Sequence, residues 1–172
     1  FDDVQVTSDG FARLEQAHAC NDASPLKLVD CSGISISDLE LAGSGNVRPD
    51  GAPPQQNGMR IAHCDDVSVV RCHFLTERST GTMKHAITIL DGCENISVRN
   101  ADVTGTRGGS IISGSADWPH PSDPPVCVKD PCAGVLVEEC HFHESQRELV
   151  FEGLTSRSQI RGMKSGTIPG KS

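Results

Sequence analysis

Residues 57–74 read NGMRIAHCDDVSVVRCHF, and the apolar side chains in this stretch alternate with polar ones. Three apolar pairs, each spaced by two, follow one another: Met59 and Ile61, Val67 and Val69, and Cys72 and Phe74. A period of two is typical of a short strand with one face buried. The stretch therefore predicts three short strands, separated by bends, that turn their apolar sides toward one interior.

The same order of residues recurs along the chain. The repeats span residues 26–41, 59–74, 87–103 and 126–142. A cysteine follows the first apolar pair of each repeat: Cys31, Cys64, Cys93 and Cys132. The residue before each second pair tolerates a positive φ: Gly33, Asp66, Asn95 and Gly134. A sharp bend between two strands needs such a residue, so each repeat is predicted to form one turn of a coil.

This pattern resembles the parallel β-helix repeat of the pectate-lyase-like superfamily over residues 26–163. The resemblance implies an all-β fold, a right-handed single-stranded parallel β-helix of about five to six coils. Equivalent residues of consecutive turns would then stack into ladders about 4.8 Å apart. We expect one domain over residues 1–172, with coils over 26–163 and a tail over 164–172.

Two segments leave alternatives open. Within residues 1–25, a cap or partial coil, Phe11, Leu14 and Ala17 have the spacing of a short N-terminal capping helix, whereas a continued strand is the alternative. Residues 109–114 resemble residues 85–90, which fit the first strand of a turn. They are therefore an alternative to residues 126–128 as the first strand of the fourth repeat. We favour residues 109–114 because the preceding connection is then shorter, and residues 115–132 become a loop excursion.

Eight cysteines raise the question of disulfides. Five recur at two inward positions of the repeat: Cys31, Cys64, Cys93, Cys72 and Cys140. A reduced thiol at such a position packs as a small apolar group. Cys127 and Cys132 flank a short loop, and a local disulfide between them is the alternative to two thiols in an oxidising compartment.

Composition excludes several classes of partner. The 172 residues include 15 Lys and Arg against 23 Asp and Glu, a net charge of −8. Nucleic acid and anionic membranes need a basic surface, so neither is expected as a partner. No uncharged apolar run approaches the ~18 residues of a membrane span. The chain opens on Phe1 rather than Met, which predicts a mature form or a fragment, and the resemblance implies an extracellular or secreted protein.

Stacking predicts a row of outward side chains between the paired residues of each third strand: Glu40, His73, Asp102 and His141. We take His73, Asp102 and His141 as catalytic candidates, because a carboxylate beside an imidazole can serve as general acid and base. Two imidazoles and a carboxylate could also bind a divalent metal. The alternative is a solvated ladder of opposite charges that only stabilises stacking.

The resemblance implies carbohydrate chemistry, by polysaccharide lyases, hydrolases or epimerases. It also makes a divalent metal such as calcium one option for a cofactor. Asp65, Asp66 and Asp91 fall near turns and do not match the carboxylate cluster of the lyases, so no metal ligand is assigned.

The candidates for substrate binding are Arg60, Lys84, Arg107 and Trp118. The cations could hold an acidic sugar and the indole could stack on one, whereas surface charge and loop anchoring are the alternatives. The absence of Tyr argues against a long sugar cleft. The sequence therefore favours an extracellular structural or binding module of a larger protein or assembly, with a carbohydrate-active enzyme as the alternative. A polysaccharide or another protein subunit would be its partner.

Overall fold

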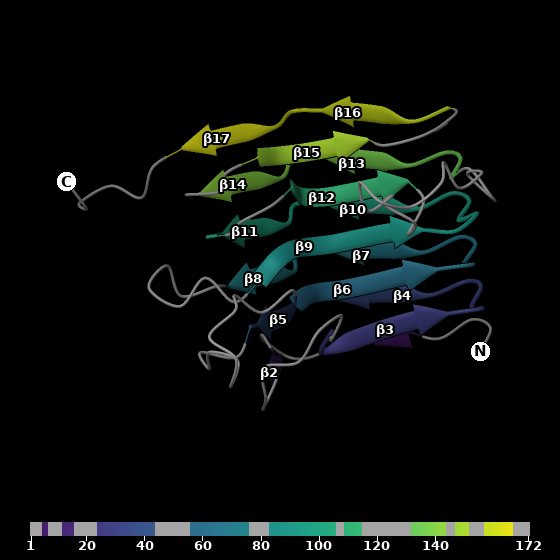
Figure 1. The fold of residues 1–172 in the computed structure, drawn as a ribbon, viewed down its shortest axis with the longest axis horizontal. Helices are drawn as coiled ribbons and strands as arrows, with labels where there is room; N and C mark the ends of the chain where they lie inside the picture. Colours follow the sequence, from purple (N-terminus) through teal and green to yellow (C-terminus); the bar gives the residue numbers. More distant parts are fainter. Residues whose placement is uncertain are drawn as a thin grey trace, which may run out of the picture.

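The computed structural model describes residues 5–6, 12–15, 24–43, 56–75, 83–105, 109–114, 132–143, 147–151 and 157–166. These residues form three parallel β-sheets and contain no helix (Figure 1). Within this part of the chain there is thus no helix that could cross a membrane. The predicted all-β class is confirmed.

Each sheet collects one strand from every repeat. Sheet 1 has the order β3 (Leu26–Val29), β6 (Gln56–Ala62), β9 (Met83–Leu90), β12 (Gly109–Gly114) and β15 (Arg147–Phe151). Sheet 2 has the order β1 (Gln5–Val6), β4 (Ser35–Ser37), β7 (Ser68–Val70), β10 (Ser97–Arg99), β13 (Leu136–Glu138) and β16 (Gln159–Arg161). Sheet 3 has the order β2 (Ala12–Glu15), β5 (Leu39–Ala42), β8 (His73–Leu75), β11 (Asp102–Thr104), β14 (His141–His143) and β17 (Lys164–Gly166).

The order of the strands in the sheets reflects the sequence repeat. Each strand pairs in parallel with the strand three further along the chain, so the chain visits the three sheets in turn and then returns to the first. Figure 1 shows the result as a stack that rises from β3 to β16 and β17. Three parallel sheets joined in this order fit a parallel β-helix.

The interior is built from the predicted alternating residues. Within residues 59–74 all six side chains of the three apolar pairs are at most 1% exposed. They stack on their equivalents in neighbouring turns, as Val69 does between Ile36 and Val98 in sheet 2. Because each strand has one buried face, a slip of one residue would turn this apolar set toward solvent, and the register is therefore strongly specified.

The bends lie at the predicted residues. Gly33, Asp66, Asn95 and Gly134 have φ angles of 66°, 52°, 53° and 65°, and Arg157 continues this column in the last turn with 56°. Neighbouring bends are also joined through side chains, since Nδ2 of Asn95 donates a hydrogen bond of 3.1 Å to Oδ1 of Asp66. The sharp turn between sheets 1 and 2 therefore requires the left-handed backbone region in every repeat.

Replacing Gly134 by alanine is expected to lower the free energy of unfolding by about 1–2 kcal/mol, because alanine strains the left-handed backbone. A Cβ atom at this position would lie 2.9 Å from Oδ1 of Asn95. That oxygen ends a flexible side chain and can turn away, so the backbone strain decides the cost. Urea denaturation measures the loss. The matched variant Gly134→Asn places the residue type of the neighbouring bend there and should cost less, whereas an alanine variant as stable as the wild type would contradict this account.

The two ends of the coil differ from expectation. Residues 12–15 form strand β2 rather than part of a capping helix, and Leu14 lies opposite Leu41 of β5. The helical interpretation is wrong for these residues, because pairing with β5 satisfies backbone groups that an uncovered edge would leave open. The alternative of a strand is confirmed for residues 12–15, whereas Phe11 and Ala17 lie outside the described residues. At the other end, β17 extends the stacked strands to Gly166, beyond the expected boundary at residue 163.

The favoured choice for the fourth turn is confirmed. β12 pairs with β9, and Ile111 lies opposite Ile87, so residues 109–114 are the first strand of that turn. Residues 126–128, with most of the expected excursion, fall outside the described residues. The weaker last turn is also present, since Leu149 lies opposite Ile111 and Ile160 opposite Val137.

The inward cysteines are buried thiols: Cys31, Cys64, Cys72, Cys93, Cys132 and Cys140. Burial raises the pKa of Cys72 and of Cys140. The pKa of Cys93 is raised mainly by its side-chain hydrogen bond with Cys132 and, to a smaller extent, by burial. The Sγ atom of Cys132 lies in the core, 3.6 Å from the carbonyl oxygen of Ile89. Cys132 is a free thiol here and Cys127 is outside the described residues, so the structure does not show the Cys127–Cys132 disulfide.

Candidate functional site

The outer face of sheet 3 has a continuous row of ionisable side chains. Each strand contributes one residue: Arg13, Glu40, His73, Asp102, His141 and Lys164. Consecutive members are register partners on adjacent strands, so the predicted ladder of carboxylates and imidazoles is present. The structure adds a cation at each end of it. We call these six residues the sheet 3 row.

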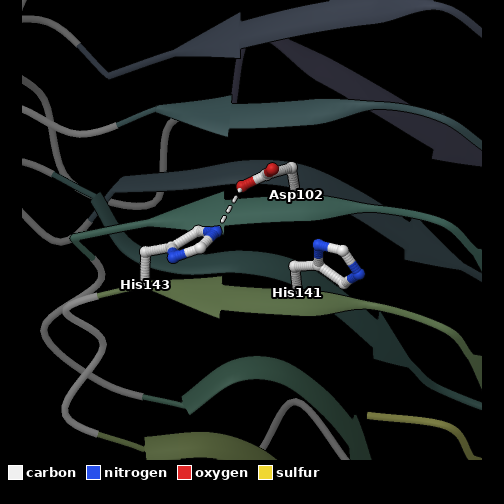
Figure 2. A group of neighbouring side chains, drawn as sticks. All are labelled: Asp102, His141 and His143. Atoms are coloured by element: carbon white, nitrogen blue, oxygen red, sulfur yellow. Dashed lines mark ion pairs between the residues drawn. The ribbon is translucent and has the colours of Figure 1, made fainter. Parts of the chain in front are cut away.

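Three side chains on this face come together around Asp102 (Figure 2). His141 and His143 belong to β14 and, being two residues apart, point to the same face of the sheet. Asp102 lies on β11 directly opposite His141. The Nε2 atom of His143 is 3.5 Å from Oδ1 of Asp102, and the two imidazole rings are edge to face with centroids 6.5 Å apart. We call these three residues the Asp102 cluster.

The Asp102 cluster combines access with partial burial. One ligand atom from each side chain lies within 4.8 Å of the other two, and all three residues are half-buried. The buried neighbours on the same strands, Val103 and Phe142, hold β11 and β14 against the core. The cluster is therefore reachable from solvent but stands on strands whose inner faces are rigidly packed.

His143 is the member that the sequence analysis missed. The signal was present in the order His141-Phe142-His143, in which a buried residue separates two outward ones. The predicted row contains the residue between the two members of each third apolar pair, and His143 lies one residue beyond such a pair. His73 lies on β8 opposite Asp102, on the side away from β14, and does not belong to the group of three close side chains.

Two other members of the row, Arg13 and Glu40, form an ion pair with each other. Nη1 of Arg13 is 2.6 Å from Oε1 of Glu40, so the guanidinium neutralises that carboxylate. Lys164 lies on β17 opposite His141 and is exposed. Among the carboxylates of the row, Asp102 is therefore the one that lies beside imidazoles rather than beside a guanidinium.

Of the substrate-binding candidates, Arg60 has a described side chain and lies away from this site. Arg60 is on β6 in sheet 1, 3.9 Å from a carboxylate oxygen of Asp91. Lys84 is on β9 in the same sheet, and its side chain is outside the described part of the chain. Arg107 and Trp118 also fall outside it. The structure thus places Arg60 on a different sheet from the Asp102 cluster and leaves the other three as predictions.

A known structure shares this fold. The chain is similar to a crystal structure described as a "putative glycosyl hydrolase" from Parabacteroides merdae, with a TM-score of 0.59. The match covers 95% of this chain and 77% of that chain at 13% sequence identity. It shows the fold alone. The chain matches no protein-family model and no curated protein, so membership of the pectate-lyase-like superfamily stays a prediction.

A second ladder lies at the bend between sheets 2 and 3. Its members all have positive φ: Asp38, Arg71, Asn100, Glu139 and Gly162. Nε and Nη2 of Arg71 donate hydrogen bonds of 2.7 and 2.6 Å to the two carboxylate oxygens of Asp38. Asp38 and Arg71 thus form an ion pair that links two neighbouring turns at the surface.

The Arg71 guanidinium holds the pKa of Asp38 below its usual value near 3.8. The ion pair therefore stabilises the fold above that value, and the contribution is lost as the pH falls through the lowered pKa. Replacing Arg71 by glutamine is expected to raise the pKa of Asp38 and to remove this pH dependence. An NMR titration of the Asp38 carboxyl carbon measures it. The variant Arg99→Gln, which removes a cation 3.4 Å from Glu138, should leave Asp38 unchanged; an equal shift there would contradict the assignment.

Proposed function

We propose that this chain is a carbohydrate-active β-helix module that binds an acidic polysaccharide along the outer face of sheet 3. The observation that carries the proposal is the Asp102 cluster, in which a half-buried carboxylate lies 3.5 Å from an imidazole nitrogen within a row of ionisable side chains. The fold shared with a "putative glycosyl hydrolase" supports it. A right-handed coil of about five to six turns and an extracellular location belong to the same proposal.

The row has the dimensions that a polymer requires. It crosses all six strands of sheet 3, which are spaced about 4.8 Å apart, so it extends for more than 20 Å. Lys164 lies exposed at one end and can attract the carboxylates of a uronic acid polymer, which the net charge of the whole chain would otherwise repel. Arg13, at the other end, is paired with Glu40. The imidazoles and Asp102 lie between these cations.

The short distance in the cluster favours one type of chemistry. Two-carboxylate glycosidases keep their acid and base about 5–9.5 Å apart. Asp102 and His143 are closer, and this spacing suits removal of a single proton from the carbon next to a sugar carboxylate. In such an elimination Asp102 would accept the proton from the breaking C–H bond, a carbon–carbon double bond forms, and the bond from carbon to the leaving glycosidic oxygen breaks as that oxygen takes up a proton. His73, on the other side of Asp102, is placed to supply that proton.

A second candidate function is a structural or binding module that docks onto another protein subunit. The pairing of surface charges favours it, because Arg13 with Glu40 and Arg71 with Asp38 neutralise each other as a purely structural ladder would. Val29, in the first strand of sheet 1, and Ile160, in the last strand of sheet 2, are about half exposed. Such residues near the two ends of the stack could contact a neighbouring subunit.

Turnover of polysaccharides separates the two functions. The purified chain is incubated with uronate polymers and with neutral polymers, and the assay follows new reducing ends together with the ultraviolet absorbance of unsaturated products. We expect unsaturated products from uronate polymers only, and their loss in a His73→Ala/His141→Ala double variant. The variant Arg71→Gln, at the bend outside the row, should retain full turnover. Turnover that survives the double substitution would overturn the catalytic proposal, and the absence of both polymer binding and turnover would favour the module that docks onto another subunit.

A further inference from the structure

We propose that Asp102, His141 and His143 form a binding site for one divalent transition-metal ion of the Zn²⁺ type. Neither the shared fold nor the proposed proton transfer requires this ion. The inference rests on three features of the cluster: the direction in which the strands point these side chains, the spacing of their ligand atoms, and the chemistry of those atoms.

The strand geometry directs the three side chains to one point. His141 and His143 are on the same face of β14, separated by the inward Phe142. Asp102 is on the neighbouring strand, opposite His141 and diagonal to His143. Figure 2 shows the carboxylate turned toward the His143 ring, with the His141 ring beside them. One carboxylate and two imidazoles therefore meet above a pair of hydrogen-bonded strands.

The spacing is close to what a metal ion needs. Zinc bonds of about 2.0–2.2 Å in tetrahedral geometry place ligand atoms roughly 3.3 Å apart. The ligand atoms of the Asp102 cluster all lie within 4.8 Å of one another, and Asp102 and His143 are already at 3.5 Å. Rotations about side-chain bonds can close the remaining gap without moving the strands. Three protein ligands would leave one position open for water or a ligand oxygen.

The ligand atoms select the class of ion. Imidazole nitrogens suit zinc, cobalt, nickel and copper, whereas calcium takes six to eight oxygen ligands. With two imidazoles and one carboxylate, this cluster is a poor calcium site. The ion expected here therefore differs from calcium, which the sequence resemblance made an option. The charge also fits, because Asp102 is the carboxylate at the site and the nearest other acid of the row, Glu40, is bound to Arg13. Lys164, opposite His141, is exposed and can extend into solvent.

The ion and the proposed proton transfer would compete. A lone pair that binds the ion cannot accept a proton, so Zn²⁺ is expected to inhibit turnover. The inference itself does not rest on the proposed function, because metal binding is measured without any sugar. A chain that binds zinc but has no turnover would refute only the proposed function. A chain with turnover but no zinc binding would refute only the metal site.

Calorimetric titration of the metal-free chain, without a histidine tag, tests the site with Zn²⁺ alone. We expect one saturable site, and a loss of affinity of about tenfold or more in each of Asp102→Asn, His141→Ala and His143→Ala, since removing even an outer partner of a ligand costs 10–100-fold. His73→Ala and His63→Ala serve as matched controls and should bind as the wild type does. Circular dichroism confirms that each variant is folded.

A second measurement reports the ligands themselves. Co²⁺ in place of Zn²⁺ should give a visible absorption band in the wild type that is lost in His143→Ala and kept in His73→Ala. Wild-type affinity in His143→Ala, or an equal loss in His63→Ala, would overturn the proposal. The absence of saturable Zn²⁺ binding would overturn it as well.

Discussion

Replacing Phe74 by alanine is expected to lower the free energy of unfolding by about 3–5 kcal/mol. Phe74 is 0% exposed and is among the largest side chains of the core. It stacks between Leu41 and Val103 on the inner face of sheet 3. The turns above and below are held at a fixed spacing by backbone hydrogen bonds, so they cannot collapse into the cavity. Since small domains have about 5–15 kcal/mol of stability, this single change would remove a large part of it.

Denaturation with guanidinium chloride, followed by circular dichroism, measures the effect of Phe74→Ala. The control Phe74→Leu keeps most of the apolar volume and should lose distinctly less stability. A loss below about 1 kcal/mol for the alanine variant would contradict tight packing at this level of the stack. An unchanged slope against denaturant concentration would show that the unfolded state is the same in both variants.

Replacing Asp102 by asparagine is expected to reduce turnover of a uronate polymer by about 10²–10⁴-fold, the usual contribution of a general base or acid. The amide has nearly the same shape but cannot accept a proton at the pH of the assay. Asp102 is half-buried on the outer face, so the free energy of unfolding should change by no more than about 0.5 kcal/mol. Loss of turnover with retained stability would therefore assign the effect to chemistry rather than to folding.

The matched control for Asp102→Asn is Glu40→Gln, which removes a carboxylate from the same row two strands away. Because Glu40 is bound to Arg13, its loss is expected to lower turnover by less than about tenfold, as for a group that does not transfer a proton. Equal turnover in Asp102→Asn and wild type would remove Asp102 from the mechanism. The polymer concentration at half-saturation reports binding, and the rate at saturation reports chemistry. Measuring both distinguishes weakened binding from slowed chemistry.

The candidate site was predictable in part. The row from Glu40 to His141 followed from the repeat, because residues at equivalent positions of consecutive turns become neighbours once the turns stack. The close approach of His143 to Asp102 did not follow, because it is diagonal across two strands and depends on the rotation of both side chains. Arg60, between Met59 and Ile61, was expected near the start of a turn and lies there on β6, but the repeat does not indicate that the close side chains gather on a different sheet.

The N-terminal region shows where periodicity fails. Three apolar residues at a spacing of three fit one face of a short helix, yet Ala12 and Leu14 also fit the alternation of a strand. A segment of four residues is too short for its own pattern to distinguish these periods. The open edge of β5 decides the outcome, because β2 can satisfy its backbone hydrogen bonds by pairing in parallel.

The sequence by itself determined the strands, the bends and the inward residues of each repeat. These depend on interactions between near neighbours: alternation over two residues, and the backbone freedom of residues such as Asn95 and Gly134 at the bends. Only the tertiary structure decided which of residues 109–114 and 126–128 completes the fourth turn, and which three side chains meet at Asp102. Both are contacts between separate turns, and such contacts exist only after the stacked strands have set their register.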